Sequence, residues 1–592
     1  MQQPRLRLAV RTLRRFVSTA ATPPQVTLPW GGRLTGCVVD PENGAPPFQS
    51  FLGIPYAAPP VGKLRFMPPQ PAEQWSGERA ASQERDVCMQ IDHYSSKVVG
   101  GEDCLYVNVH RPPTTRPDDK KPVLVYVHWG LWSLSNNSMT ECGPEFFVAK
   151  DMIVVTVNYR VLSFGFLTLN SPAAPGNMGI RDCFAGLRWV HDNITAFGGD
   201  PNRVTLFGFC VGAIISQLAQ YSDRCKGLFQ QSILVSGSMQ QSWLGAVPGD
   251  VMRARGLKLA RLLGCHSDND EEILTHLQSA PVADLFKATW SCVPQPLSDR
   301  NSAPFLPIID IDAVADPADA IIPENPARMV RGQRSNPVPT LWGLARDDGH
   351  IIRGDGMLWE GTRAEEKSLA ERFEQLERTL PWDLDLGLPN SRRRQDLIRT
   401  IRDLYFHDSS PPTVSEYTNF LSEMNITRGV VEAARRHSTH PQRPRSWLYC
   451  FSVEGGNGRT KKRFNLPSGI VAHGDDMGYY FGCRGDPPGP EPRWPPDSIE
   501  AVTRRRMVAL LSNFVKYGDP TPDHEPEPEL RGVRWPLLPD HMAAPFPYLD
   551  IGKDLVVREE LQGVRMRFWQ DVYDRYFTTG DTPAARNPRS FT

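Results

Sequence analysis

One stretch of the chain has the spacing of a reactive side chain held on a tight turn. The β-prone run Val204–Phe207 leads into a Gly-x-x-x-Gly turn from Gly208 to Gly212, and an apolar helical segment follows. Strand, turn and helix in this order are the context of a nucleophile elbow, where small residues let the backbone turn sharply and expose one side chain. The usual motif is Gly-x-Ser-x-Gly, and its central residue in this chain is Cys210.

Sulfur at this position permits two interpretations. The ordinary pKa of a cysteine is near 8.5, and a helix N-terminus together with a neighbouring imidazolium brings such a thiol below neutrality. Cys210 is then a nucleophile that attacks an acyl carbon and forms a thioester. Buried, unreactive cysteines are also common, so Cys210 as an inert core residue at a lapsed site is the alternative.

The segments around Cys210 predict the framework that positions it. Short apolar, β-branched runs at 124–127, 153–157, 204–207 and 232–235 alternate with helical stretches such as 182–193 and 211–221. This alternation is typical of a parallel sheet flanked by helices. Ligands bind at the carboxyl ends of the strands in such sheets, where the elbow would lie.

Composition excludes several classes of function. The 592 residues have a formal net charge of −1, so no overall field favours nucleic acid as a partner. No run approaches the roughly 18 apolar residues of a transmembrane segment. No glycine-rich phosphate loop and no metal-spaced His/Cys cluster follows a strand, so the sequence predicts neither a cofactor nor a metal.

The two ends of the chain differ from the middle. Residues 1–29 contain arginine but no acidic residue, and the arginines interleave with apolar residues as in an amphipathic transit peptide. We expect either a transit peptide or a disordered leader, hence an intracellular protein, mitochondrial or cytoplasmic, with secretion less favoured. The polar tail 578–592 is predicted to be disordered.

Several motifs resemble a known family. The segments Phe51–Ala57, Glu102–Val109, Asn158–Arg160 and Phe197–Pro201 match, in order, signatures of type-B carboxylesterases, the cholinesterase-like family. The resemblance extends from about Trp30 to Tyr576. It implies one α/β-hydrolase domain over residues 30–577, with a central, mostly parallel sheet flanked by helices and with cap insertions.

The resemblance also implies the partners of Cys210. The segment 338–349 is similar to the family's acid loop and gives Asp348 as the acid, where most relatives have Glu; Asp347 is a neighbouring rival. The segment 468–476 is similar to the histidine loop and gives His473 as the base. A Cys210–His473–Asp348 triad is therefore expected, in the chain order of this fold.

The family's oxyanion loop, His-Gly-Gly-Gly followed by an aromatic residue, has changed in this chain. Here it reads His128-Trp129-Gly130-Leu131-Trp132. Backbone N–H groups are the donors in such a hole, so we predict the N–H groups of Gly130 and Leu131 as donors. The resemblance adds the N–H of Val211, after the nucleophile. Trp129, Trp132 and Phe209 are expected to line the pocket, and Phe209 replaces the acid that precedes the family's nucleophile.

Eleven cysteines form no complete set of pairs. Cys88 and Cys104 are close enough in sequence to form a disulfide in an oxidising compartment. Cys265 matches the first half of a family disulfide, but His276 stands where its partner would be.

These features predict a carboxylesterase-like hydrolase or acyltransferase that acts on a small hydrophobic ester or thioester through the Cys-His-Asp triad. Two alternatives remain open at this stage. The altered oxyanion loop is compatible with a non-hydrolytic lyase, cyclase or isomerase, and the thiol is compatible with a catalytically silent binding protein.

Overall fold

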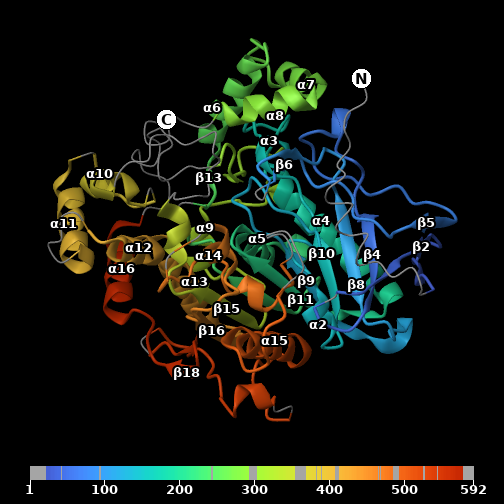
Figure 1. Ribbon diagram of the computed structural model, residues 1–592. Helices are drawn as coiled ribbons and strands as arrows, with labels where there is room; N and C mark the ends of the chain where they lie inside the picture. Colours follow the sequence, from blue (N-terminus) through green and yellow to red (C-terminus); the bar gives the residue numbers. More distant parts are fainter. Residues whose placement is uncertain are drawn as a thin grey trace.

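A large mixed sheet forms the centre of the molecule (Figure 1). The computed structural model describes residues 22–41, 43–92, 95–241, 244–292, 303–353, 369–381, 383–388, 390–406, 412–464, 466, 468–483, 492–524, 527–542 and 545–577. The eleven strands of this sheet are, in spatial order, β18 (Leu555–Arg558), β17 (Tyr548–Ile551), β16 (Ser446–Phe451), β15 (Thr340–Ala345), β12 (Gln231–Val235), β11 (Gly199–Phe209), β9 (Lys121–Val127), β10 (Ile153–Val157), β8 (Tyr106–Arg111), β4 (Phe48–Pro55) and β3 (Cys37–Val39).

The middle of the sheet is parallel. Every neighbouring pair from β10 to β17 runs in the same direction, and only the pairs at the two ends are antiparallel. The four strands expected from the sequence are β9, β10, β11 and β12. The prediction of a mostly parallel sheet is therefore confirmed.

Helices surround the sheet, on its two faces and at one end (Figure 1). They are α2 (Glu145–Val148), α3 (Leu162–Phe166), α4 (Met178–Asn193), α5 (Val211–Gln220), α6 (Gly249–Leu262), α7 (Asp270–Ser279), α8 (Val282–Trp290), α9 (Pro326–Arg331), α10 (Leu369–Glu374), α11 (Arg392–Phe406), α12 (Val414–Ser422), α13 (Arg428–Ser438), α14 (Arg459–Phe464), α15 (Ile499–Tyr517) and α16 (Gly563–Tyr576).

Strand β16 shows how the two faces are filled. Successive side chains of a strand point to opposite faces. Trp447 packs edge-on against Phe514 of α15, with ring centroids 5.7 Å apart. The next residue, Leu448, belongs to a separate buried cluster that includes Val430 of α13. The parallel strands are thus buried on both sides, as α/β folds require.

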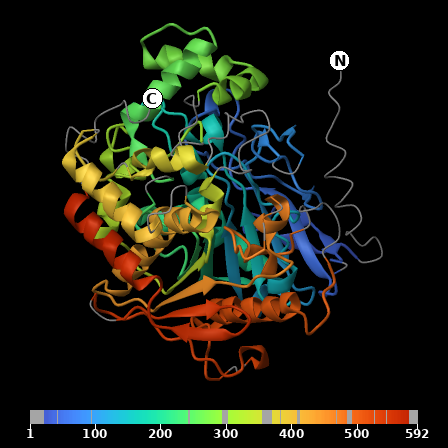
Figure 2. The same cartoon turned by 60° about the vertical axis from the view of Figure 1, so that its left-hand side comes forward.

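Three helices stand apart from the sheet. In both views of the molecule, α6, α7 and α8 form a separate green layer at one end (Figures 1 and 2). They lie between β12 and β15 in the sequence, so they are an insertion between two neighbouring strands. This arrangement matches the expected cap insertions.

The ordered domain begins earlier than the sequence suggested. Strand β1 (Gln25–Thr27) pairs with β2 (Arg33–Thr35), which pairs with β5 (Glu78–Ala80), so a strand starts inside the segment predicted as a leader. Its central residue, Val26, is buried, and this apolar contact is what the boundary at residue 30 overlooked. Residues 1–21 of the predicted leader and the tail 578–592 lie outside the described residues.

The cysteines are thiols in this structure. Cys88 and Cys104 nevertheless lie together, since a hydrogen bond to Cys88, followed by burial, raises the pKa of Cys104 well above its ordinary value. The bridge between them stays a prediction. At the other family position, His276 Nε2 makes a hydrogen bond with the carbonyl of Leu263 at 2.9 Å, which gives this ring a local structural role.

Candidate active site

The candidate residues gather at one edge of the sheet. The oxyanion loop follows β9, Cys210 follows β11, and Asp348 comes three residues after the end of β15. These strands are neighbours in the sheet together with β12, and all four are parallel. Their carboxyl ends therefore meet at one edge, and His473 reaches this edge from a segment after α14.

Cys210 has the backbone of a nucleophile elbow. Its φ is 57° and its ψ is −121°, a combination that costs a residue with a side chain about 1–3 kcal/mol. The flanking glycines make the turn possible: a Cβ on Gly208 would lie 2.1 Å from the carbonyl oxygen of Gly212. The geometry places Cys210 at the N-terminus of α5, as the motif predicted.

His473 is held by Asp348. Its Nδ1 lies 3.0 Å from Asp348 Oδ1, and both side chains are almost completely buried. Asp348 is itself fixed, because Ser236 Oγ donates to its two oxygens at 3.1 and 2.9 Å and the N–H of Ala345 donates at 3.0 Å. These bonds orient the carboxylate and, through it, the imidazole ring.

Ser236 was missed in the sequence. It is the first residue after β12, so it lies at the same sheet edge as Cys210, and its φ of 51° turns the chain away from the strand. A search for polar residues directly after each parallel strand would have found it.

The neighbouring Asp347 points elsewhere. Its carboxylate accepts the N–H of Val471 at 2.8 Å and the guanidinium of Arg346 at 3.0 Å. The structure therefore brings Asp348, and not Asp347, to His473.

Cys210 acts on the same imidazole. Burial alone would lower the pKa of His473, but the charge of Cys210 and the hydrogen bond to Asp348 outweigh burial and raise this pKa to about 10. Among the described residues, His473 Nε2 has no hydrogen-bond partner. The ring therefore bonds a carboxylate through Nδ1 and keeps Nε2 free near the thiol, as expected of a base that exchanges a proton with a nucleophile.

Phe209 covers one side of the histidine. Its ring centroid lies 4.7 Å from that of His473, and the rings are tilted by 37°. A Cβ on Gly474, the residue after the histidine, would lie 3.0 Å from the Phe209 ring. Phe209 thus replaces a carboxylate by an apolar wall that excludes water from the imidazole.

The altered oxyanion loop keeps free donors. In the part of the chain that the structure describes, the N–H groups of Gly130, Leu131 and Val211 donate no hydrogen bond. Val211 begins α5, where helices leave N–H groups without internal partners. The loop also touches the elbow, since a Cβ on Gly212 would lie 2.8 Å from the carbonyl oxygen of His128.

This loop is strained at two residues, of which Leu131 stands where the family has glycine. Leu131 and Trp132 have φ values of 54° and 63°, in the left-handed region that side chains disfavour. Gly130 has a φ of 125°, and a Cβ there would lie 1.9 Å from the carbonyl oxygen of Leu134, so only glycine fits. Strain kept in this way is common at functional sites.

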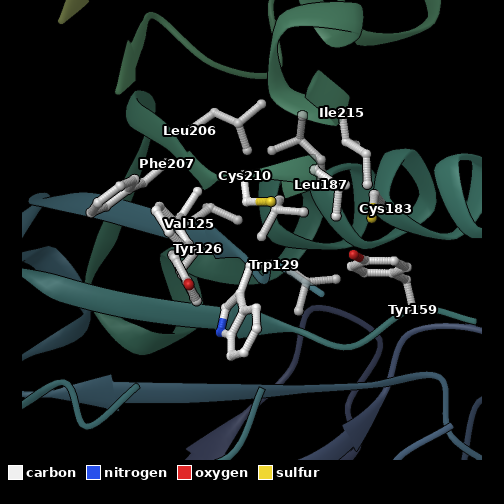
Figure 3. Close-up of a cluster of buried hydrophobic side chains, with 14 of the residues drawn as sticks. Val125, Tyr126, Trp129, Tyr159, Cys183, Leu187, Leu206, Phe207, Cys210 and Ile215 are labelled. Atoms are coloured by element: carbon white, nitrogen blue, oxygen red, sulfur yellow. The ribbon is translucent and has the colours of Figure 1, made fainter. Parts of the chain in front are cut away.

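The predicted pocket residues differ in their surroundings. Trp129 lies in the same cluster of buried apolar side chains as Cys210, together with Leu187 and Ile215 (Figure 3). Trp132 is completely buried, and its Nε1 donates to the carbonyl of Leu244 at 3.1 Å. We therefore assign Trp132 to the packing that supports the loop.

Several thiols outside the candidate site are buried. Burial raises the pKa of six of these thiols above its ordinary value, so they lose a proton less readily than an exposed thiol. They are Cys37, Cys142, Cys183, Cys225, Cys292 and Cys450.

The residues that the structure describes hold neither a metal site nor a membrane-spanning helix. No group of three or more His, Cys, Asp or Glu side chains there has an arrangement that would hold a metal ion. In the same residues, every helix is too short or too polar to cross a membrane.

Three features together define an α/β-hydrolase: the nucleophile elbow, the buried histidine–carboxylate pair and the loop at the end of a parallel strand. Comparison with known proteins gives the family: the model of the carboxylesterase family matches residues 22–569, and the chain belongs to this family. It is 31% identical to a juvenile hormone esterase of Tribolium castaneum over 507 residues, 80% of each chain. It is also 31% identical to a carboxylic ester hydrolase of Bombus ignitus, over 89% of this chain and 90% of the other.

A solved structure agrees. The crystal structure of juvenile hormone esterase from Manduca sexta, with OTFP covalently attached, superposes with a TM-score of 0.79 at 25% identity. The match covers 94% of this chain and 99% of the other. The relatives are serine esterases, so the cysteine is a departure of this chain.

The comparisons correct the expected location. We expected an intracellular protein, mitochondrial or cytoplasmic, from the arginines near the N-terminus. That expectation is wrong, because the close relatives, including juvenile hormone esterase and esterase FE4 of Myzus persicae, are secreted insect esterases. The arginines lie in residues 1–21, where a weak compositional pattern was the only argument.

Proposed function

We propose that this carboxylesterase-family hydrolase cleaves a hydrophobic ester or thioester with Cys210 as nucleophile, His473 as acid and base, and Asp348 as the orienting group. The observation that supports it most directly is the buried pair in which His473 Nδ1 lies 3.0 Å from Asp348 Oδ1, on an imidazole whose pKa the charge of Cys210 also raises. A lapsed site would have no reason to hold an imidazole between these two groups.

The chemistry has two halves. The Cys210 thiolate attacks the acyl carbon, the C–O or C–S bond to the leaving group breaks, and His473 gives its proton to that group. Water then attacks the thioester with His473 as base, and the carboxylic acid leaves as the thiol is restored. An alcohol in place of water gives acyl transfer instead.

The oxyanion that forms in each half of the reaction needs hydrogen-bond donors. We propose that the N–H groups of Gly130, Leu131 and Val211 supply them, because they are free within the described chain and the two loops that hold them touch. Donors of this kind act on the transition state only if their positions are fixed beforehand. The left-handed backbone of Leu131, kept despite its side chain, supports such a fixed position.

The surroundings favour an apolar acyl group. Trp129, Leu131 and Phe209 are all apolar and at least nine-tenths buried. Phe209 offers no charge to a substrate, and the Arg459 guanidinium over the Trp129 ring is already paired with Glu141. A hydrophobic substrate gains from burial here.

The test is a panel of p-nitrophenyl esters and acyl thioesters of increasing chain length, measured for the native chain and for Cys210→Ala. We expect turnover that rises with acyl length and is lost in Cys210→Ala. Turnover that is equal in the two proteins would show that the activity does not depend on this thiol, and the proposed triad would be wrong.

A further inference from the structure

Two segments that flank the site meet at one short backbone contact. Gly143 and Gly482 form an isolated antiparallel bridge, in which the N–H of each donates to the carbonyl of the other at 2.8 and 2.9 Å. A pair that exchanges both bonds is followed on either side by a pair that exchanges none, where the side chains come closest. On one side, that next pair is Cys142 and Cys483.

The sulfur atom of Cys483 lies close to Cys142, as this pairing requires. Cys483 Sγ lies 3.6 Å from the carbonyl oxygen of Glu141, which belongs to the peptide group that joins Glu141 to Cys142. The charge of Cys483 also acts on the Cys142 thiol. In pairs of this type the Cα atoms are about 4.5 Å apart, which is within the range of roughly 4.4–6.8 Å that disulfides span.

We propose that Cys142 and Cys483 form a cross-strand disulfide that connects the segment 128–142, which begins with the oxyanion loop, to the segment 473–483, which begins with His473. Neither cysteine takes part in the proposed acyl chemistry, and the proposal does not depend on it. It follows from the backbone bridge and from the placement of the two sulfur atoms.

Cys142 and Cys483 differ in solvent exposure, and this difference determines which thiol reacts first with an oxidant. Cys142 is 1% exposed, whereas Cys483 is partly exposed and lies 4.0 Å from a guanidinium nitrogen of Arg459. A cation beside sulfur stabilises its thiolate. Cys483 is therefore the thiol that a low-molecular-weight disulfide, such as oxidised glutathione, reaches first.

The exchange balances in two steps. The Cys483 thiolate attacks the oxidant, its S–S bond breaks, and one glutathione leaves as a thiolate that takes up the proton lost by Cys483. Cys142 then loses its proton and attacks the mixed disulfide, and the second glutathione leaves as a thiol. Two protein thiols are oxidised and one glutathione disulfide is reduced to two thiols.

Such a bond would support the site from outside. Residues 128–142 contain the oxyanion loop, and Glu141 in this segment forms a buried ion pair with Arg459. The Arg459 guanidinium lies over the Trp129 ring at 5.0 Å from its centroid. A covalent link between Cys142 and Cys483 would add a second connection from residues 128–142, next to this ion pair.

The test uses the full chain. Folded protein is reduced, incubated with oxidised glutathione, capped with N-ethylmaleimide, digested without reductant and mapped by mass spectrometry. We expect a peptide pair linked through Cys142 and Cys483, and a melting temperature a few degrees higher than that of the reduced protein. In Cys483→Ser the pair and the temperature gain should both disappear, while Cys292→Ser, a change at another buried thiol, should keep both.

Three results would overturn the inference. The first is Cys483 with glutathione attached while Cys142 carries the maleimide cap. The second is both residues capped after oxidation, and the third is either one linked to a different cysteine. Mapping of the native chain decides among these results even if a variant fails to fold.

Discussion

Removing the His473 imidazole should slow the reaction of Cys210 with an alkylating agent by a calculable factor. A thiol of ordinary pKa, about 8.5, is only about 3% thiolate at pH 7. A thiol that has transferred its proton to His473 is fully thiolate. In His473→Gln we therefore expect the iodoacetamide rate at pH 7 to fall by about 30-fold or more, and the burial of Cys210 adds to the loss.

The pH dependence of the alkylation rate of Cys210 gives a second test of this pairing. The pKa of His473 is raised from 6.5 to about 10, so the imidazole keeps its charge between pH 7 and 9 and loses it as the pH rises through about 10. The native rate should therefore be nearly constant between pH 7 and 9. In His473→Gln the rate should rise with pH over the same interval, as an isolated thiol does.

The assay is peptide-resolved alkylation of Cys210 under limiting iodoacetamide, with folding checked by circular dichroism. His437→Gln is a matched control, because His437 is another buried histidine that bonds a backbone carbonyl, that of Val338. It should leave the Cys210 rate unchanged. Equal rates and equal pH slopes in the native chain and His473→Gln would refute the reasoning that the imidazole holds the thiolate.

Three further changes test the surroundings of the triad. Ser236→Ala removes two hydrogen bonds to Asp348 and should lower kcat about tenfold, or roughly 1–2 kcal/mol, with KM unchanged; an unaltered kcat would contradict the role of Ser236. Leu131→Gly relieves a left-handed φ but opens a cavity, so short-chain ester turnover should rise while thermal unfolding shows a net loss of about 1–3 kcal/mol; unchanged turnover would show that this side chain does not narrow the pocket. Cys210→Ser should not raise ester turnover, because a serine needs firmer base assistance; a faster serine variant would contradict the thiolate–imidazolium pairing.

Much of the framework was predictable from local pattern. The runs at 124–127, 153–157, 204–207 and 232–235 are short, apolar and β-branched, so their periodicity and the helices between them indicated a parallel sheet. The glycines at 208 and 212 indicated the elbow, because close backbone contacts leave no room for a Cβ. These are local constraints, and a sequence shows them directly.

Other features depend on contacts between distant segments. The choice between Asp347 and Asp348 is made by a strand-end turn that directs one carboxylate to Arg346 and the other to His473. Ser236 acts through a residue 112 positions away. No spacing within the sequence encodes such pairs.

The oxyanion loop was predictable from the sequence only in part. Its altered sequence predicted a reshaped oxyanion hole. It did not show which residues would adopt a left-handed backbone conformation. The structure places the strain at Leu131 and Trp132 and leaves Trp129 outside it. Trp132, expected in the pocket, is buried against Leu244 instead, because its indole N–H finds a backbone carbonyl there.

The most direct test of the account is to trap the acyl-enzyme. The native chain, mixed rapidly with p-nitrophenyl butyrate, quenched in acid and digested, should yield one butyryl group on the peptide that contains Cys210. The adduct should be released by hydroxylamine, as thioesters are, and should be missing in Cys210→Ala. A butyryl group on another residue, or rapid release of p-nitrophenol with Cys210 unmodified, would contradict the central claim that Cys210 is the nucleophile.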